Sequence, residues 1–424
     1  MPKGPPSREM NAEQAARLLG IRKETLYAYV SRGLLRSIES GDGRARSYLR
    51  SEVESLRQQR ELRRQPAKAA RDALHFGTPL LESGLTLIEH GRLYYRGLDV
   101  CEMSRRHRLE QVAGWLWLHD TEAAEELFAG EPEAPPSAVL ELATGPCRRP
   151  WSLEALQAAL PIFGLGDPGA WSTDKAPDVA AAAARLLMRM TRLASGGLWR
   201  GSIAETLLAG WRRQEAQAEK VGSETARSEM ARQLIDAALI LCADHELNVS
   251  TFTARCVASA GSPIASVVAA GLAALQGPEH GGHTRRMEAL LREAGRPEEL
   301  ADVVADRLRR GDPVPGYGQK LYPQGDPRYL ELSGRLRELG GEVAAWADAI
   351  DEAGREIVQD SPTVDAALVL TARGLDLPRD AALCLFALGR TVGWVGHALE
   401  QYAAGQLIRP RADYVGPSPP RRSD

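Results

Sequence analysis

The sequence predicts a mainly α-helical protein in which a small basic domain precedes a larger acidic body. Its 424 residues are enough for two or three domains with a sizeable core. Apolar residues make up 44% of the chain but aromatic residues only 5%, which indicates an aliphatic core of packed helices. Residues 1–71 hold 16 Lys and Arg against 8 Asp and Glu, a net charge of +8, whereas the remainder has a net charge of −11.

Composition and spacing exclude several classes of protein. The longest apolar run that stands out, Ile264–Leu275, is shorter than the roughly 20 residues that a bilayer requires. The N-terminus lacks the apolar segment of a secretory signal, and the cysteines have no paired spacing. We therefore expect no membrane span and a reducing, cytoplasmic location. The five cysteines are Cys101, Cys147, Cys242, Cys256 and Cys384.

The basic domain begins with two short helices. In the first, Ala15 and Leu19 recur at helical spacing, and Gly20 can end the helix. In the second, Leu26 and Val30 lie four residues apart and face inward, which leaves the polar side chains for another surface. Two short helices joined by a glycine-containing turn are typical of a helix-turn-helix.

The stretch that follows, residues 31–48, has the turn chemistry of a small hairpin wing, and a charged helix is expected from Arg50 to about Arg64. This order resembles the winged helix-turn-helix of mercury-resistance regulators. The resemblance implies that the second helix enters the DNA major groove while the wing contacts the backbone. The residues assigned to DNA contact are Arg22, Lys23, Thr25, Tyr29, Arg44 and Arg46. A solvated basic face or a protein-docking module remains the alternative.

The domain boundary falls in a polar, Pro- and Ala-containing joint. We expect a helix-turn-helix domain over 1–65 and a linker over 66–74. From residue 75 the chain consists of Ala/Leu helix patterns separated by Gly and Pro. The one β-like exception is a hairpin over 85–95.

Two histidines of the body stand where apolar helices end. An apolar stripe at helical spacing, from Leu234 through Leu241, leads to His245 and predicts a buried histidine at the end of that helix face. His280 lies between glycines, where a substrate could approach backbone N–H groups closely. Each histidine taken alone also fits a structural role. No third ligand follows His280 and His283 at the usual spacing, so no metal site is expected.

One carboxylate and three arginines complete the candidates. Asp365 directly precedes the helical run Ala366–Leu370, so it is either a helix N-cap or a catalytic base. Arg328, Arg390 and Arg409 lie among apolar or turn residues. Each could be a surface charge, but a buried guanidinium suits bidentate binding of a carboxylate.

Taken together, these segments resemble citrate synthase over about residues 75–424. Several strings in the right order are far more specific than any one of them. The matching strings are Ala243–Phe252, Gly277–Gly282, Pro315–Gly318, Asp326–Arg328, Val364–Asp365 and Gly389–Trp394, with a weaker match at Leu93–Asp99.

The resemblance implies a fold and a reaction. The fold is a homodimer whose subunits each have a large helical domain, here 75–276 and 386–424, and a small one, 277–385, that closes over the substrates. The reaction joins acetyl-CoA, oxaloacetate and water into citrate and CoA. Acetyl-CoA is a substrate, and no other cofactor is implied.

The resemblance also implies roles for single residues. Asp365 would take a proton from the acetyl-CoA methyl, and neutral His280 would donate a hydrogen bond to the developing enolate oxygen. His245, Arg328 and Arg390 would hold oxaloacetate, with Arg409 reaching in from the other subunit. The residues expected near CoA are Pro315, Gly316, Tyr317 and Gly318.

The chain departs from the family at Gln319. The family usually has a histidine there, which polarises the oxaloacetate carbonyl; a Gln amide can donate a hydrogen bond but cannot become a cation. Residues Ala366–Leu368 are also unusual, because the family commonly has an aromatic and then small polar residues. Two alternatives to a citrate synthase therefore remain: a DNA-binding regulator whose weakened body senses a metabolite, and a 2-methylcitrate synthase.

Overall fold

The chain folds into two compact units, residues 1–82 and 83–424, which we describe separately. A computed structural model describes residues 9–31, 35, 37–39, 46–49, 53, 56, 81–144, 149–167, 169, 171–215, 224–412 and 414–417. The predicted linker 66–74 lies outside these residues, and so do Arg44 and most of the charged helix expected over 50–64.

The first unit is a small sheet with two helices. Strand β1 (Glu9–Asn11) pairs antiparallel with β3 (Arg46–Leu49), which also pairs with β2 (Ile38–Glu39). Helix α1 (Ala12–Leu19) ends at left-handed Gly20, as the sequence predicts, and it starts at a capping box formed by Asn11 and Gln14, which was not predicted. Helix α2 (Lys23–Ser31) follows. β1 was not expected. The described core of the unit is Met10, Ala15, Ala16, Leu19, Leu26, Leu35, Tyr48, Val53 and Leu56.

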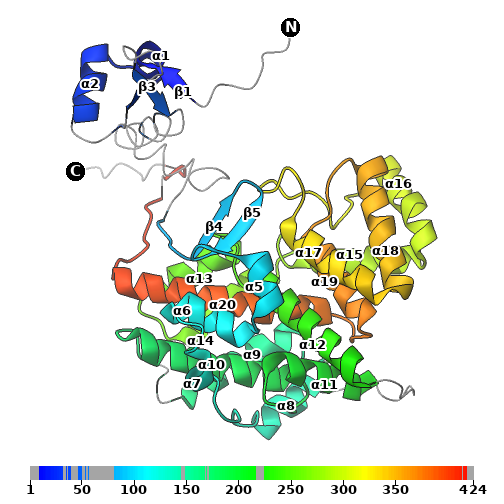
Figure 1. The fold of residues 1–424 in the computed structure, drawn as a ribbon. Coiled ribbons are helices and arrows are strands. Elements are labelled where there is room, and N and C mark those ends of the chain that lie inside the picture. The colour runs from blue at the N-terminus through cyan, green and yellow to red at the C-terminus, as the bar shows by residue number, and fades with distance from the viewer. Residues whose placement is uncertain are drawn as a thin grey trace. The chain divides into compact units, whose positions relative to one another are not determined.

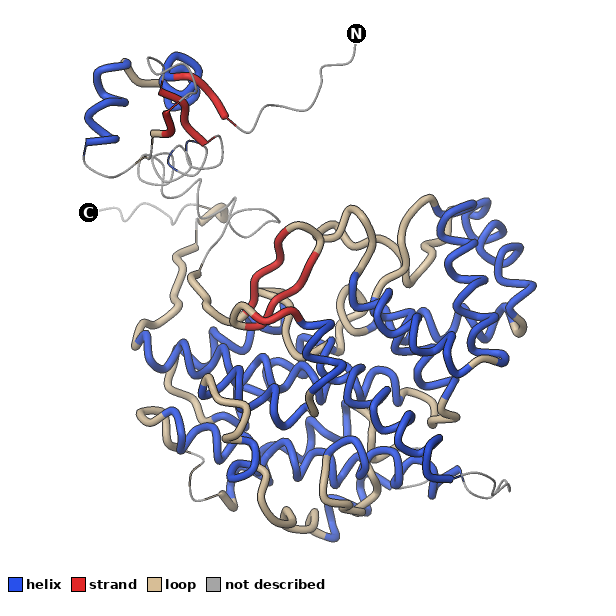
Figure 2. The backbone as a smooth tube through the Cα atoms, in the orientation of Figure 1, coloured by secondary structure: helices blue, strands red, loops and turns tan. Residues whose placement is uncertain are grey.

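The second unit opens with an antiparallel sheet and is otherwise helical, as Figure 2 shows. The predicted hairpin forms β4 (Thr86–Glu89) and β5 (Arg92–Tyr95), to which β6 (Leu98–Asp99) adds. The helices are α5 (Val100–Arg106), α6 (Leu109–Leu118), α7 (Ala124–Leu127), α8 (Ser137–Thr144), α9 (Leu153–Leu165), α10 (Ala176–Ala194), α11 (Ile203–Glu215), α12 (Glu224–Leu241), α13 (Val249–Ser259), α14 (Ile264–Leu275), α15 (Gly282–Ala294), α16 (Leu300–Arg310), α17 (Pro327–Leu339), α18 (Gly341–Ala353), α19 (Val364–Gly374) and α20 (Ala381–Ala404), with a short 3-10 helix at Pro297–Glu299 and a π-helix at Gly354–Val358.

Helix α20 is the core helix of this unit and packs against α10, α12, α13, α14 and α19. By length and composition alone it could cross a membrane, which the sequence analysis did not anticipate. However, 94% of its most apolar window is buried inside the unit, as in the central helix of a folded domain. A glycine of the neighbouring helix allows close packing: a Cβ on Gly271 of α14 would strike the ring of Trp394 on α20.

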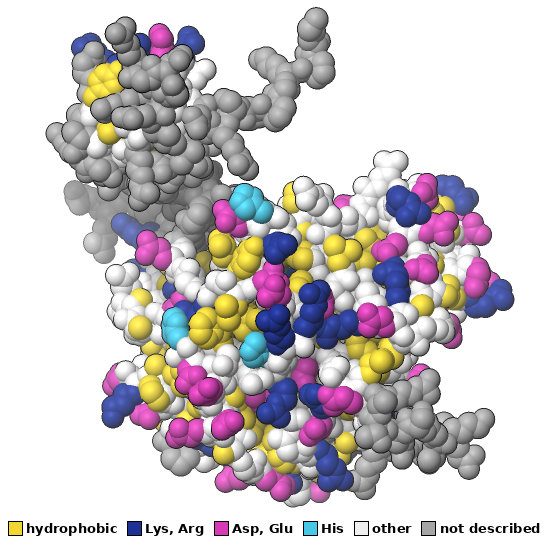
Figure 3. Space-filling model, in the orientation of Figure 1, with side chains coloured by type: hydrophobic (Ala, Val, Ile, Leu, Met, Phe, Trp, Pro, Cys, Tyr) yellow, Lys and Arg dark blue, Asp and Glu magenta, His cyan; other side chains and the backbone are white. Residues whose placement is uncertain are grey.

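Helices α15 to α19 gather on one side of the unit (Figure 1), where α17 and α15 both pack on α19. This grouping is consistent with the expected small domain 277–385, which remains a proposal. On the face drawn in Figure 3, positive and negative side chains are interspersed over this unit. Such a surface is typical of a solvated protein face.

Candidate active site

His245 is buried in the loop between α12 and α13. The sequence predicted that it would end the helix face, but α12 stops at Leu241, so this prediction was wrong in detail. The reason is tertiary: donors outside α12 bind the carbonyls around its end. The Tyr95 hydroxyl donates to the oxygen of Ile240, Arg390 Nε to that of Cys242 and the Gly393 N–H to that of Ala243.

The surroundings of His245 keep it neutral. Its Nε2 lies 3.0 Å from the hydroxyl of Tyr322, and the two rings meet edge to face. Burial lowers the pKa of His245 well below its ordinary value, and the positive charges of Arg328 and Arg390 lower it further. The structure thus brings together His245, Arg328 and Arg390, the three residues to which the family resemblance assigned oxaloacetate binding.

The two buried arginines have different partners. Arg328 forms two hydrogen bonds to the Asp326 carboxylate, through Nε and Nη2 at 2.9 and 2.8 Å, and the same carboxylate caps the start of α17. Arg390 donates from Nε to the Cys242 carbonyl, whereas its buried Nη1 has no hydrogen-bond partner among the described residues. Leaving a buried guanidinium N–H group without a hydrogen bond costs free energy of folding. Nη1 is therefore suited to donate a hydrogen bond to an anionic ligand.

His280 lies in the turn between α14 and α15, as predicted from its glycine neighbours. Its Nε2 is 2.8 Å from the hydroxyl of Ser250, the second residue of α13. Burial lowers its pKa to about 4, with a further contribution from the positive charge of Arg390. At neutral pH the imidazole is therefore uncharged and can donate a hydrogen bond without carrying a positive charge.

Asp365 is the second residue of α19, and the N-cap position belongs to Thr363, so the N-cap interpretation of Asp365 was wrong. Its carboxylate instead accepts hydrogen bonds from the hydroxyls of Thr284 and Thr363. Burial raises the pKa of Asp365, although the Thr284 hydrogen bond acts in the opposite direction. A carboxylate with a raised pKa is a stronger base once ionised.

The loop predicted to contact CoA is joined to the segment that leads into Asp365. The Thr363 N–H donates to the Gly316 carbonyl at 2.9 Å, and the Gly318 N–H donates to Ser361 at 3.0 Å. Gly316 and Gly318 both have positive φ, and a Cβ on Gly316 would strike Met287. The Tyr317 hydroxyl donates to the Ile350 carbonyl at 3.0 Å, while Pro315 is buried. This loop therefore has little freedom to change shape alone.

The side chains of two other predicted residues form no described hydrogen bond with this cluster. The half-buried Gln319 accepts a hydrogen bond on its amide oxygen from the Leu321 N–H at 3.4 Å. Arg409 is exposed on the segment after α20, so its predicted role in the partner subunit's site stays a prediction. Among the described side chains, no group of three or more His, Cys, Asp or Glu could hold a metal ion.

Sequence reasoning missed four polar residues of the site: Asp326, Thr284, Ser250 and Tyr322. Asp326 and Ser250 lie within the matched strings and were quoted without a role. Thr284 and Tyr322 lie outside those strings, and only the folded chain places them beside Asp365 and His245.

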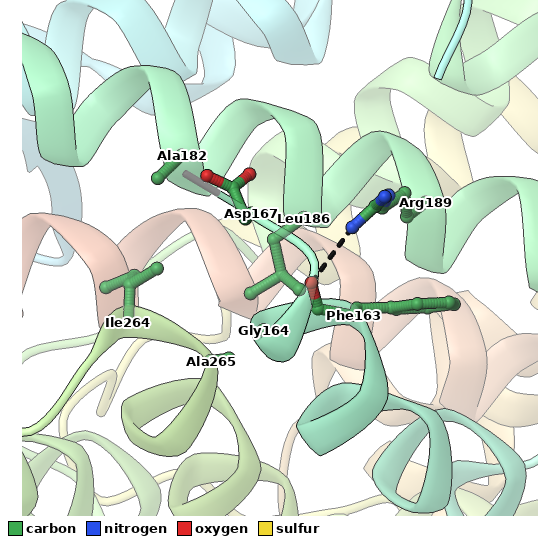
Figure 4. Close-up of a pocket in the computed structure, with 8 residues that line it drawn as sticks. All are labelled: Phe163, Gly164, Asp167, Ala182, Leu186, Arg189, Ile264 and Ala265. Carbon is green, nitrogen blue, oxygen red and sulfur yellow. Dashed lines mark hydrogen bonds between the residues drawn. The ribbon is translucent and has the colours of Figure 1, made fainter. Parts of the chain in front are cut away.

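Two cavities lie outside this cluster. The one in Figure 4, between α9, α10 and the start of α14, holds about 10 Å³ and is crossed by a hydrogen bond from Arg189 to the Phe163 carbonyl. None of the predicted site residues lines it, and it is about large enough for one water. A second cavity, of about 370 Å³, adjoins Pro327 and Cys101, and its arginines pair with Asp99 and Glu331.

The site residues occur in a helical fold that is known from other proteins. The family model "Citrate synthase, C-terminal domain" matches residues 74–411, most of the chain. The chain belongs to the citrate synthase family. A helix-turn-helix domain model matches residues 9–61. These matches confirm the fold class, the family and the N-terminal helix-turn-helix that the sequence predicted.

Similar proteins and solved structures point to the same family. The chain is 30% identical over 366 residues to citrate synthase 2 of Bacillus subtilis, covering 80% of this chain and 95% of that one. It is 31% identical over 202 residues to a 2-methylcitrate synthase of Shewanella oneidensis, 46% of this chain and 53% of that one. The crystal structure of citrate synthase from Thermotoga maritima superposes with a TM-score of 0.64 at 26% identity, over 82% and 96% of the two chains. The enzyme class predicted from the sequence is thereby confirmed.

Proposed function

We propose that the chain condenses acetyl-CoA with oxaloacetate and water, giving citrate and CoA. The observation that carries this proposal is a buried cluster with complementary protonation states. His280 is neutral, the pKa of Asp365 is raised, and Arg390 Nη1 has no partner among the residues that the structure describes. A neutral hydrogen-bond donor, a strengthened base and a buried cation are what an acyl thioester and a dicarboxylate require.

Proton removal from the acetyl methyl is the difficult step, because that C–H group is a weak acid. Asp365 would take the proton, and His280 would donate a hydrogen bond to the thioester oxygen as it becomes an enolate oxygen. The hydroxyls of Thr284 and Thr363 hold the Asp365 carboxylate in place. Because Asp365 acts as a base only when ionised, activity should fall as the pH drops through its raised pKa.

Oxaloacetate carries two carboxylates and a keto group. Arg390 would bind one carboxylate through its unpaired Nη1, and Arg328, held rigidly by Asp326, would bind near the other. We propose that Arg409 of a second subunit completes this pocket, which requires a homodimer. We place the protein in the cytoplasm, where both substrates occur and the described cysteines, Cys101, Cys242, Cys256 and Cys384, remain free thiols.

The CoA side of the pocket would be the Pro315–Gly318 loop. Because this loop is hydrogen-bonded to the segment before Asp365, a ligand that orders the loop also orders the base. The loop packs on Met287 of α15 and binds the Ile350 carbonyl of α18, which supports a small domain, 277–385, that closes on the large domain and excludes water.

The test is release of free CoA thiol from acetyl-CoA by the purified protein, with and without oxaloacetate. Thiol release that requires oxaloacetate is the expected result. Asp365→Asn should reduce it by about 10³-fold or more while oxaloacetate still binds. Asp348→Asn, the same change at an exposed residue of α18, is the matched control and should keep full activity. Thiol release unchanged in Asp365→Asn would refute the assigned base.

The N-terminal unit supports a second activity, DNA binding. A helix-turn-helix model matches residues 9–61, and residues 1–71, which include this region, have a net charge of +8. Arg22 and Lys23 are exposed at the start of α2, Thr25 and Tyr29 are partly exposed along it, and Arg46 lies on β3. Here the alternative is that the body serves as a metabolite sensor for a transcriptional regulator. Steep weakening of DNA binding with salt, and further weakening by Arg22→Ala, would support DNA contact.

A 2-methylcitrate synthase activity remains the other alternative, because one relative carries that name over part of its length. It differs in using propionyl-CoA in place of acetyl-CoA. The ratio of kcat/KM for the two thioesters decides between them: a higher value for acetyl-CoA supports the main proposal.

A further inference from the structure

Tyr322 is a buried residue whose hydroxyl has no role in the reaction proposed above. It follows the Pro315–Gly318 loop in a tight turn, where its N–H donates to the Gln319 carbonyl and its own carbonyl accepts from the Gly325 N–H. Only 2% of the residue is exposed. Its hydroxyl lies 3.0 Å from His245 Nε2, and the Arg328 guanidinium carbon stands 5.6 Å from its ring centre.

Both members of the Tyr322–His245 pair are uncharged at neutral pH. Burial raises the pKa of Tyr322 and lowers that of His245. Two hydrogen-bond arrangements are then available at the 3.0 Å contact. When His245 donates from Nε2 to the phenol oxygen, the phenol proton is free to point at a third group.

That third group is defined by the charges around the pair. Arg328 lies 5.6 Å from the centre of the Tyr322 ring, and Arg390 binds the Cys242 carbonyl three residues before His245, so a dicarboxylate bound by both arginines would have its central carbons near His245 and Tyr322. A keto oxygen there becomes an alkoxide when its carbon is attacked, and it needs a donor at that moment. Gln319, in contrast, has its amide oxygen bonded to the Leu321 N–H and contacts neither His245 nor Arg328 in any described hydrogen bond.

We propose that Tyr322, rather than Gln319, activates the keto group of oxaloacetate, a role that rests on the proposed condensation. As the acetyl methyl carbon bonds to the keto carbon, the C=O π bond breaks and its electron pair moves onto oxygen. The phenol proton of Tyr322 passes to this oxygen. The resulting phenolate, which accepts the hydrogen bond from His245 Nε2, takes a proton from solvent, and Asp365 releases to solvent the proton that it took from the methyl group, so the protons balance. The positive field of Arg328 and Arg390 stabilises the charge during the transfer.

The kinetic test compares three variants. Tyr322→Phe keeps the ring but removes the hydroxyl and should lower kcat for thiol release by about 10²–10³-fold. Oxaloacetate affinity, measured by calorimetry, should change less than threefold. Tyr329→Phe is the matched control and should retain kcat, because the hydrogen bonds that the described residues give this buried hydroxyl go to Asp351 and Ala347 of α18. A normal kcat in Tyr322→Phe, or a large loss in Gln319→Leu with Tyr322→Phe unaffected, overturns the proposal.

A second measurement needs binding alone and so separates this proposal from the condensation itself. The infrared carbonyl stretch of ¹³C-labelled oxaloacetate bound to the wild-type protein should lie below its value in water, because a donated hydrogen bond weakens the C=O bond. In Tyr322→Phe the shift should be lost and in Gln319→Leu it should remain. A wild-type protein that shifts the stretch without releasing thiol retains the role of Tyr322 and refutes the condensation. No shift in the wild type, or no binding, overturns the role of Tyr322.

Discussion

Ser250 decides which nitrogen of His280 carries the proton. Its hydroxyl lies 2.7 Å from Asn248 Oδ1 and 2.8 Å from His280 Nε2, and it has one proton to donate. If that proton points at Asn248, His280 must donate from Nε2 to Ser250 and has no proton on Nδ1. If it points at His280, the imidazole carries its proton on Nδ1, where it can reach a substrate oxygen. The hydrogen bond from Trp394 Nε1 to Ser250 is compatible with both arrangements.

Ser250→Ala should therefore lower kcat by about 10-fold to 100-fold, since His280 loses the group that orients it. The KM for oxaloacetate should change little, because Ser250 does not contact the arginines in any described hydrogen bond. Steady-state thiol release measures both constants. Thr253→Ala, which also removes a hydroxyl from α13, is the control, because the Thr253 hydroxyl donates to the Val249 carbonyl of the same helix. Equal losses in both variants would mean that Ser250 only stabilises the helix.

His280 also predicts how stability depends on pH. Its pKa is about 4 in the folded chain, against about 6.5 in an unfolded one. Between these values the unfolded chain binds a proton that the folded chain does not, so stability falls as the pH drops from about 6.5 toward 4. The loss at pH 4 reaches at most about 3 kcal/mol. His280→Gln should flatten this slope in urea unfolding, whereas His90→Gln, at an exposed turn, should not. An unchanged slope in His280→Gln would contradict the assignment.

At the scale of the elements, the sequence predicted those helix ends and turns that depend on residues close together in the chain. Gly20 ends α1 as its residue type predicted, and the hairpin of β4 and β5 followed from alternation around a turn. The end of α12 could not be predicted this way, because the apolar pattern continues toward His245 while the carbonyls are taken by Tyr95, Arg390 and Gly393. Those donors are far away in the sequence, so no local pattern contains them.

The same limit applies to the site. Periodicity and turn chemistry drew attention to His245, His280 and Asp365, and the resemblance supplied their roles. The hydroxyl that each of them contacts, on Tyr322, Ser250 or Thr284, comes from a different element and becomes visible only in the fold. For Asp365, the sequence left the choice between N-cap and base open, and the position of Thr363 excluded the cap.

The Pro315–Gly318 loop gives a prediction at this scale. Gly316→Ala places a Cβ against Met287 at a positive φ, so the loop must shift, and with it the Thr363 N–H that leads into Asp365. We expect a lower kcat and a higher KM for acetyl-CoA, each by about 10-fold, consistent with a small misplacement of a catalytic group. The matched control is Gly311→Ala, which has a similar positive φ but open space around it. Kinetics that are equal in both variants would show that backbone strain alone is responsible.

At the scale of the whole molecule, the question is whether the two units influence each other. A helix-turn-helix joined to an enzyme body has two possible uses: the body senses a metabolite for the DNA-binding unit, or the two act independently. Binding measurements distinguish these two uses. In a sensor, oxaloacetate changes the DNA affinity and, by thermodynamic linkage, DNA changes the oxaloacetate affinity by the same factor; in independent units neither affinity changes. A sensor requires coupling of about 1–3 kcal/mol, a 5-fold to 150-fold change.

For an enzyme with an accessory DNA-binding unit, we expect DNA affinity of the full chain to change less than twofold on saturation with oxaloacetate and CoA. Fluorescence anisotropy with labelled DNA at fixed ionic strength measures it, since phosphate contacts make the affinity depend strongly on salt. Lys23→Ala should weaken DNA binding while thiol release stays intact, because Lys23 is exposed on α2 and pairs only with Glu13 among the described side chains. Lys175→Ala, ahead of α10, is the control for loss of one charge. A ligand-dependent change above fivefold, matched in the reciprocal titration, would instead establish a metabolite-sensing regulator.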